Sequence, residues 1–436
     1  RPARSSPVRL SSSAKDTAGR GLRAPAGILT RTSGGRSLRG AAAAALMPHR
    51  NEAEREDDCR FRDSFPDSSM PAPSFRSRVR GCLLGGALGD ALGADIEFLS
   101  HDEIVACHGS DGPDHLGSGY GVLGAITDDT QMTLWTAEGS LRAYRRGASR
   151  GIVSVPGVVL RAYFRWLGTQ GEAPDKLAAR TSWLYAIEAL HARRAPGMTC
   201  LGALRAWNQK GPNDPEPTNT SKGCGGVMRM APVGLLSDRP GVAFDLGCKI
   251  AKLTHGHPTG IIASGAFAVA IWHLAEGADL GTALAHARQS AAEAEGGEET
   301  VDALDRAQSL ATGTLSDADA VHALGTVTPD AGPGWVAEEA LAVAALCARR
   351  YPSDPERALR MAVTHTGDSD STGAICGNLL GAALGVDALP ARWVGAVELR
   401  DAILQVADDL HDARTVQVDW YYGPKGTGWY DRYPPG

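Results

Sequence analysis

Apolar residues recur with helical spacing through most of the chain from Ser77 onward. Runs of Ala, Leu and Val carry the pattern of amphipathic or buried helices, for example over 261–276, 336–350 and 397–410. The strict alternation of apolar and polar residues that marks β-strands is nearly absent. The pattern therefore predicts an all-α domain over about 77–413.

Stretches rich in Gly, Pro or charge separate the predicted helices. Residues 211–217 and 329–333 are predicted turns, and the acidic stretch 293–299 is predicted to be a solvated connection. The C-terminal segment 414–436 combines aromatic residues with Gly and Pro. We expect this tail to dock as an irregular strap rather than as a helix.

Two segments carry a glycine at every fourth position. The first contains Gly81, Gly85, Gly89 and Gly93, with Glu97 next in the series, and the second contains Gly373, Gly377, Gly381 and Gly385. Residues four apart share one face of a helix, so each segment presents a stripe without side chains to a close neighbour. Glycine inside a helix costs about 0.5–1 kcal/mol relative to alanine, so packing has to compensate. We expect two buried central helices, and if they pack on each other, Glu97 comes within reach of the acids at 368–370.

A similar spacing occurs in helices that dimerise inside membranes. Asp90, Asp95 and Asn378 lie within these two segments, and the apolar stretches between them are short for a bilayer. We expect no uncharged apolar run of 18 residues anywhere in the chain, so the sequence predicts no membrane span.

Two clusters of acids and hydroxyls stand directly before apolar helices. They are Thr127, Asp128 and Asp129 in the first, and Asp368, Asp370 and Ser371 in the second. Helix capping explains one such residue per helix. Several adjacent acids repel each other and are costly in apolar surroundings unless they are protonated or neutralised. Because Mg²⁺ and Mn²⁺ prefer oxygen ligands and would neutralise them, the two interpretations are capping and a metal site.

Three further features offer candidate chemistry. The glycine-rich stretch 221–232 has backbone N–H groups that could cradle a diphosphate, but it lacks the GxxxxGK[ST] pattern of a P-loop. Cys224 within it has no neighbouring His or Asn pattern to activate it, which favours an inert, packed thiol. His255 and His257 suit a substrate wall, a capped turn or, less well, a zinc site.

Composition limits the class of protein. The chain has 436 residues, 43% hydrophobic residues and a net charge of −6. These values suit a soluble globular protein and give no reason to expect a nucleic-acid or anionic-membrane partner. Its eight cysteines are spread singly and form no CxxC pair, as in proteins of a reducing compartment. We therefore expect a cytoplasmic location.

The first 76 residues differ from the rest of the chain. Residues 1–46 carry nine Arg or Lys residues against one acid, Asp16, and have little to bury, so we expect 1–76 to be a disordered extension. Its start suits either an organelle transit peptide or a wrongly translated upstream region with Met47 as the true start, and we favour the second. The apolar run 41–46 is too short for a signal-peptide core of about 7 to 15 residues.

Five ordered motifs give the chain a resemblance to a known family. They are GCLLGGALGDALGADIEF, ITDDTQMTLWTAEG, SKGCGGVMRMAP, THGHPTG and GDSDSTGAICG. In this order they resemble the ADP-ribosylglycohydrolase family, and within it the branch of ADP-ribosylarginine hydrolases and dinitrogenase reductase activating glycohydrolases. The resemblance implies an all-α fold in the form of a compact orthogonal helical bundle, with a binuclear Mg²⁺ centre, or Mn²⁺ in its place, at helix N-termini. It also implies an enzyme that removes ADP-ribose from modified proteins.

The resemblance also implies roles for residues of these motifs. The metal ligands would be Thr127, Asp128, Asp129, Asp368, Asp370 and Ser371. The substrate would contact Glu97, Ser221, Gly223, Cys224, Gly225, Met228 and His255. One carboxylate must take a proton from the attacking water, and Asp129 or Glu97 is expected to do so.

The expected substrate is the N-glycosidic bond of ADP-ribosylated arginine. Within the family, Cys224 stands where the serine-specific branch tends to carry Asn. The alternatives are O-linked (serine) or nucleobase-linked ADP-ribose, a free ADP-ribose derivative, or an inactive ADP-ribose-binding protein. The expected partner is an ADP-ribosylated protein and the expected state is a monomer, with no stable nucleic-acid or membrane partner.

Overall fold

The computed structural model of the chain describes residues 72–172, 182–210, 219–327, 331–415 and 428–434. Every regular element in these ranges is a helix, apart from an isolated bridge between Gly223 and Val336. The all-α prediction is therefore confirmed for this part of the chain. The predictions for 1–71 and for the turn at 211–217 lie outside the described residues.

The helices have the following bounds, with short 3-10 helices labelled η. They are α1 Phe75–Gly93, α2 His101–His108, α3 Asp128–Arg150, α4 Val155–Thr169, η4 Leu184–Ala186, η5 Glu188–His191, α5 Met198–Lys210, η6 Cys224–Gly226, α6 Ala231–Leu236, α7 Pro240–Ala251, α8 Pro258–Ala275, α9 Leu280–Ala292, α10 Glu298–Ala311, α11 Asp317–His322, α12 Ala337–Arg350, α13 Pro355–Val363, α14 Ser369–Leu384, η8 Val386–Ala388, α15 Ala391–Val394, α16 Arg400–Thr415 and α17 Trp429–Arg432.

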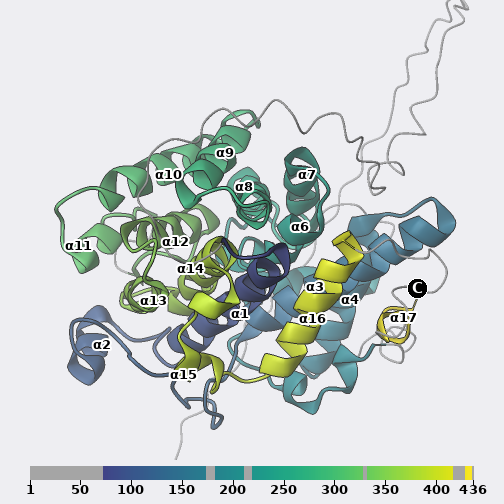
Figure 1. The fold of residues 1–436 in the computed structure, drawn as a ribbon, viewed down its shortest axis with the longest axis horizontal. Coiled ribbons are helices and arrows are strands. Elements are labelled where there is room, and N and C mark those ends of the chain that lie inside the picture. Colours follow the sequence, from purple (N-terminus) through teal and green to yellow (C-terminus); the bar gives the residue numbers. More distant parts are fainter. Residues whose placement is uncertain (1–71, 173–181, 211–218, 328–330, 416–427, 435–436) are drawn as a thin grey trace, which may run out of the picture. The chain divides into compact units, whose positions relative to one another are not determined.

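The two glycine-striped helices, α1 and α14, pack directly on each other (Figure 1). A Cβ atom added to Gly85 would lie 2.3 Å from the carbonyl oxygen of Gly377, and one added to Gly89 would lie 1.9 Å from that of Gly373. Both distances are far below van der Waals contact, so only glycine permits this approach of two backbones. The expectation of two buried central helices is confirmed, and the pairing of the two stripes, which the sequence left open, is present. Their close contact is the packing gain that offsets the cost of helical glycine.

The other helices pack around this central pair. α12 contacts α14 and α10, α16 contacts α1 and α3, and α8 contacts α7 and α9. In Figure 1, α9 to α13 lie on one side of α1 and α14, and α3, α4 and α16 lie on the other. Large side chains such as Trp135, Trp166 and Phe267 are fully buried between these helices. The central pair is therefore the frame that places the helix N-termini described below.

Several helix ends differ from the predicted bounds. α16 begins at Arg400 rather than near 397, and it continues to Thr415. α10 begins at Glu298, inside the acidic stretch that was predicted to be a connection. Its first turn holds Glu298 and Glu299. Acids there interact favourably with the positive end of the helix dipole, which explains why an acidic stretch begins a helix here.

The described end of the tail is helical rather than irregular. α17 and the residue after it gather around Asp409 of α16: Arg432 Nε donates to Asp409 Oδ2 at 2.8 Å, and Tyr433 OH donates to the same oxygen at 2.9 Å. Asp409 is buried, so these bonds satisfy a carboxylate that water does not reach. The tail docks as predicted, but the prediction of a wholly irregular strap is wrong for 429–432. Residues 416–427 lie outside the described ranges.

Among the described helices, α8 alone is long and apolar enough to cross a membrane, over Pro258–Ala275. The expectation that the chain contains no uncharged apolar run of 18 residues is therefore wrong. Within the fold, 78% of this stretch is buried. A helix that is apolar on all faces is expected in the core of a large protein as well as in a membrane, and here other helices cover it.

Candidate active site

The first acid cluster forms the N-terminus of α3. Thr127 is the N-cap, and its Oγ1 accepts a hydrogen bond from the backbone N–H of Asp129 at 3.3 Å. Asp90, from the glycine-striped α1, holds this helix end from outside. Its carboxylate accepts from Thr127 N at 3.0 Å, Thr127 Oγ1 at 2.8 Å and Thr130 N at 3.0 Å. Because capping is shared by Thr127 and Asp90, Asp128 and Asp129 are not needed for it.

The second acid cluster forms the N-terminus of α14. Asp368 is the N-cap and accepts from the backbone N–H of Ser371 at 3.3 Å, while Asp370 Oδ1 accepts from the same N–H at 2.9 Å. The end of α1 lies directly against this turn, since a Cβ atom on Gly93 would lie 2.5 Å from the backbone nitrogen of Asp370. The glycine contact therefore fixes where these acids stand.

Side chains of the two clusters contact each other. Ser371 Oγ donates a hydrogen bond to Asp129 Oδ1 at 2.9 Å, which joins the N-termini of α14 and α3. The Cys224 thiol donates to Asp368 Oδ2 at 2.8 Å. The clusters are far apart in sequence, so the tertiary fold alone brings them to one place.

These side chains line a pocket of about 440 Å³, named here the acid pocket. Eleven predicted site residues line it, namely Glu97, Asp128, Asp129, Gly223, Cys224, Gly225, Met228, His255, Asp368, Asp370 and Ser371. Two predicted site residues, Thr127 and Ser221, do not. Thr127 is buried behind the acids against Asp90, and Ser221 Oγ lies 3.2 Å from Thr199 Oγ1 and accepts the N–H of Gly223.

Sequence reasoning missed several parts of the acid pocket. Asp90 supports it from α1, and a lone acid in a buried glycine-rich helix was the available signal. The segment 195–200 lines one wall, and the backbone N–H of Gly197 donates to Asp128 Oδ2 at 3.1 Å. Phe98 and Trp335 also line the pocket and stack with ring centroids 6.3 Å apart. Phe98 ends the first of the five motifs but was not assigned a role, and no motif marked Trp335.

Burial and mutual repulsion control the protonation of the acids. Burial raises the pKa of Asp128, Asp129 and Asp370 well above the ordinary value, and neighbouring carboxylates raise each of them further. Burial and then the charges of Asp370 and Asp368 raise the pKa of Glu97 to about 10. The cluster thus holds more negative charge than the protein around it neutralises.

The glycine-rich loop is less open to phosphate than predicted. The N–H of Gly223 donates to Ser221 Oγ at 3.2 Å, and that of Cys224 donates to the carbonyl oxygen of Trp335 at 3.2 Å. The N–H groups of Val227 and Met228 both donate hydrogen bonds to the carbonyl oxygen of Cys224 and so close the η6 turn. A cradle formed by all the N–H groups of this loop is therefore excluded, because most of them already have acceptors.

His255 and Cys224 stand in the acid pocket in uncharged forms. Burial and then the charge of Arg229 lower the pKa of His255 to about 3, and its Nδ1 lies 2.8 Å from Thr254 Oγ1. Burial and then the charge of Asp368 raise the pKa of the Cys224 thiol well above its ordinary value. The inert thiol is thus the better interpretation of Cys224, and a neutral imidazole faces the pocket.

His257 is the N-cap of α8, and its Nδ1 accepts from the backbone N–H of Thr259 at 3.2 Å. This position supports the capped-turn interpretation. A zinc site there has no support, since no group of three or more His, Cys, Asp or Glu side chains in the described ranges already surrounds one point as metal ligands.

The residue types of the acid pocket fit a hard divalent cation. They offer carboxylate and hydroxyl oxygens, which Mg²⁺ and Mn²⁺ prefer. Glu97 Oε2 is buried without a hydrogen-bond partner, and the raised pKa values mark a lack of positive charge. In the described residues Asp129 instead accepts from Ser371 and Asp368 from Cys224, so no finished coordination shell of the predicted binuclear centre is present there.

Comparisons with known proteins identify the family of this chain. Residues 71–419 match the ADP-ribosylglycohydrolase family. The chain is 25% identical over 342 residues to the ADP-ribosyl-[dinitrogen reductase] glycohydrolase of Rhodospirillum rubrum, covering 76% of this chain and 94% of that protein. It is 28% identical over 354 residues to an uncharacterized protein of Archaeoglobus fulgidus, covering 78% and 97%. A solved structure described as an ADP-ribosylglycohydrolase-related protein complex superposes with a TM-score of 0.54 at 25% identity, covering 78% of this chain and 99% of that one. The expected resemblance is confirmed: this chain belongs to the ADP-ribosylglycohydrolase family.

Proposed function

We propose that this protein is a metal-dependent hydrolase that removes ADP-ribose from arginine side chains of modified proteins. The observation that carries the proposal is the meeting of two helix N-termini, which places Asp128, Asp129, Asp368 and Asp370 around one pocket. The relative from Rhodospirillum rubrum is named for removing ADP-ribose from a protein, dinitrogen reductase. A protein substrate is therefore the favoured class.

The acids would hold two Mg²⁺ ions, with Mn²⁺ as the alternative. Asp128 and Asp129 would bind from the end of α3, and Asp368 and Asp370 from the end of α14. When bound, such ions orient ribose hydroxyls and lower the pKa of a water. The concentration of carboxylates supports this assignment, because a cation removes the repulsion that raises the pKa values of Asp370 and Asp129.

Hydrolysis adds the hydroxyl of water to the anomeric carbon and a proton to the departing guanidine nitrogen. Glu97 lines the pocket with a buried carboxyl whose Oε2 has no hydrogen-bond partner, and burial raises its pKa above the ordinary value, so it is the proposed donor to that nitrogen. Asp129 is the proposed acceptor of the proton from water, with its Oδ1 held by Ser371 Oγ. The transition state has oxocarbenium character, which the surrounding carboxylates stabilise.

The walls of the acid pocket suit the rest of ADP-ribose. Its volume of about 440 Å³ falls within the range of small-molecule sites, about 300–1,000 Å³. Phe98 and Trp335 offer aromatic faces to a base, and neutral His255 offers no charge that would repel the guanidinium of an arginine. Cys224, in place of the Asn of the serine-specific branch, supports the arginine linkage. A cytoplasmic monomer remains our prediction for the working protein.

The test is release of free ADP-ribose from an arginine-ADP-ribosylated protein with Mg²⁺ and with EDTA, beside serine-linked and nucleobase-linked substrates. We expect metal-dependent release from arginine alone. Release from another linkage would support the proposed hydrolase activity but contradict the assignment of arginine as the linked residue. Tight ADP-ribose binding without release from any substrate would overturn the enzyme and favour an inactive binding protein. Asp401→Asn, an exposed acid on α16, is the matched control for Asp128→Asn.

A further inference from the structure

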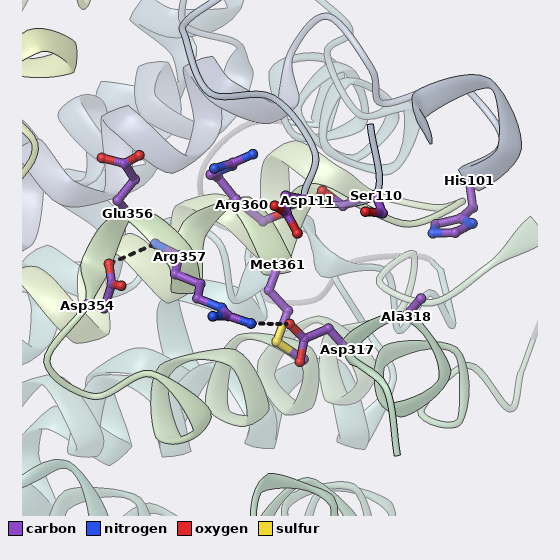
Figure 2. Close-up of a pocket in the computed structure, with 11 residues that line it drawn as sticks. His101, Ser110, Asp111, Asp317, Ala318, Asp354, Glu356, Arg357, Arg360 and Met361 are labelled. Atoms are coloured by element: carbon purple, nitrogen blue, oxygen red, sulfur yellow. Dashed lines mark hydrogen bonds and ion pairs between the residues drawn. The ribbon is translucent and has the colours of Figure 1, made fainter. Parts of the chain in front are cut away.

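A second pocket, of about 450 Å³, lies apart from the acid pocket (Figure 2). It is enclosed by the start of α2 and the loop after it, the start of α11, and α13. Residues that line it include His101, Ser110, Asp111, Asp317, Arg357 and Arg360. None of its lining residues belongs to the acid pocket. It is named here the arginine pocket, because two guanidinium groups of α13 reach it.

The two arginines have little negative charge bound to them. Arg357 and Arg360 are three residues apart on α13 and therefore share a face of the helix. Arg357 Nη2 forms a long ion pair with Asp317 Oδ2 at 3.9 Å, beyond hydrogen-bond distance, and its Cζ lies 4.4 Å from the centroid of the Tyr351 ring (Figure 2). Arg360 Nη2 donates to the carbonyl oxygen of Gly112 at 3.0 Å, and its Nε is buried without a partner. Within the described ranges, neither guanidinium is hydrogen-bonded to a carboxylate.

Most carboxylates of the arginine pocket already accept hydrogen bonds from groups other than the two α13 guanidiniums. Asp317 accepts a hydrogen bond from Arg350 at 2.9 Å, and Glu356 accepts one from Arg392 at 2.5 Å. Asp354 is the N-cap of α13 and accepts from the first turn of that helix. These acids therefore do not neutralise the two α13 guanidiniums fully, and the pocket can accept an anionic group.

The loop wall of the pocket has a different chemistry. Ser110 and Asp111 lie on the loop that follows α2, and Figure 2 shows them on the side of the pocket formed by that loop, facing α13. Both residues are exposed, and no side-chain partner of Asp111 is present in the described chain. A carboxylate here accepts hydrogen bonds from hydroxyl groups and repels a second anion. The ligand should therefore carry its negative charge at one end only.

We propose that the arginine pocket is a second ligand site, for a small phosphorylated compound that carries hydroxyl groups, of the sugar-phosphate type. The phosphate contacts Arg357 and Arg360, whose planar forks of N–H donors match phosphate oxygens. The hydroxyls contact Asp111 and Ser110. The volume of the pocket is sufficient for such a compound. This site does not depend on the proposed hydrolase activity.

The test is isothermal titration calorimetry of the full chain with ribose 5-phosphate. We expect the double variant Arg357→Gln/Arg360→Gln to bind about tenfold or more weakly, since each lost guanidinium removes charge-assisted hydrogen bonds. Arg357→Gln alone should also weaken binding, and it leaves the fold intact because the Arg357 side chain is 61% exposed. Arg288→Gln is the matched control: Arg288 is an exposed arginine of α9 paired with Asp305, so its loss should not change the affinity.

Three further probes identify what the arginine pocket recognises. Inorganic phosphate should bind more weakly than ribose 5-phosphate, ribose alone should not bind, and AMP tests whether a nucleotide is the source of the phosphate. Asp111→Asn should weaken ribose 5-phosphate but not inorganic phosphate. The proposal is overturned if no probe binds at millimolar concentration or if both Gln variants bind as wild type does. It is equally overturned if Asp128→Asn, in the acid pocket, removes the binding instead.

Discussion

The acid pocket and the arginine pocket differ in how deeply their charged side chains are buried and in whether these have partners of opposite charge. In the acid pocket, Asp128, Asp129 and Asp370 are buried together and accept hydrogen bonds from a hydroxyl or from backbone N–H groups rather than from Lys or Arg. In the arginine pocket, acids such as Asp317 and Glu356 are paired with arginines, and the groups are more exposed. Charge that is buried and unbalanced identifies a site prepared for a counterion. In the arginine pocket the acids have arginine partners of their own, so the two guanidiniums of α13 are the groups left to bind an anion.

The largest expected effect separates the two pockets by activity. Asp370→Asn should lower turnover by about 100- to 1,000-fold or more, because it removes a charge that the reaction uses. The same variant should melt at the same temperature as wild type or higher when metal is absent, since it relieves repulsion. ADP-ribose release and a thermal melt measure the two results. Glu356→Gln in the arginine pocket is the control and should keep full turnover. A strong loss of stability in Asp370→Asn would contradict the metal-site interpretation.

The second effect concerns the helix contact that holds the acid pocket together. Gly89→Ala would place a Cβ 1.9 Å from the carbonyl oxygen of Gly373, so α1 and α14 must separate. We expect a loss of about 1–3 kcal/mol or more in the free energy of unfolding, measured by denaturant titration. Gly202→Ala on α5 is the control, because its Cβ meets nothing within 4 Å, and it should stabilise by about 0.5–1 kcal/mol. Equal effects of the two changes would refute the close contact.

A third effect tests whether Asp90 positions the acids. In Asp90→Asn, the amide group offers one acceptor in place of two and sets an N–H beside the donors at Thr127 and Thr130. We expect Mg²⁺ affinity to fall about tenfold, because Asp90 holds the helix end that positions the proposed metal ligands. The melting temperature should also be lower. Calorimetric titration with Mg²⁺ gives the affinity. The control is Asp95→Asn. Asp95 accepts a hydrogen bond from the backbone N–H of Gly119, outside the acid pocket, so this variant should bind Mg²⁺ as wild type does. An unchanged affinity in Asp90→Asn would limit Asp90 to capping α3.

The smallest effect is on the pH dependence of stability. Folding raises the pKa of Glu97 from 4.5 to about 10 and that of Asp90 from 3.8 to about 7. Between these values the folded state binds more protons than the unfolded state, so the metal-free protein should lose stability as pH rises from about 5 to 9. Glu97→Gln should flatten the upper part of this slope, above pH 7, and saturating Mg²⁺ should oppose the loss. Thermal melts across the pH range measure it, and a melting temperature that rises with pH would show that the acids are not held protonated.

The sequence was most informative where a local pattern implied a contact. The fourfold spacing of Gly85 and Gly89 in one segment, and of Gly373 and Gly377 in another, predicted two helices that approach closely, and they do. It was less informative where a turn decides the outcome. The glycine-rich loop has a composition typical of anion-binding loops. However, the backbone N–H of Cys224 in this loop donates a hydrogen bond to the carbonyl oxygen of Trp335, which is distant in the chain.

By itself, the sequence determined the helical class, the glycine stripes, and the two acid clusters with their family motifs. These features are local, because helix periodicity and capping depend on residues within a few turns. The tertiary structure alone decided that Ser371 meets Asp129, that Asp90 supports α3, and that Arg357 and Arg360 face a loop 250 residues away in the chain. These contacts depend on how segments that are distant in sequence pack against each other. The local sequence pattern therefore does not show which charged groups will be close together.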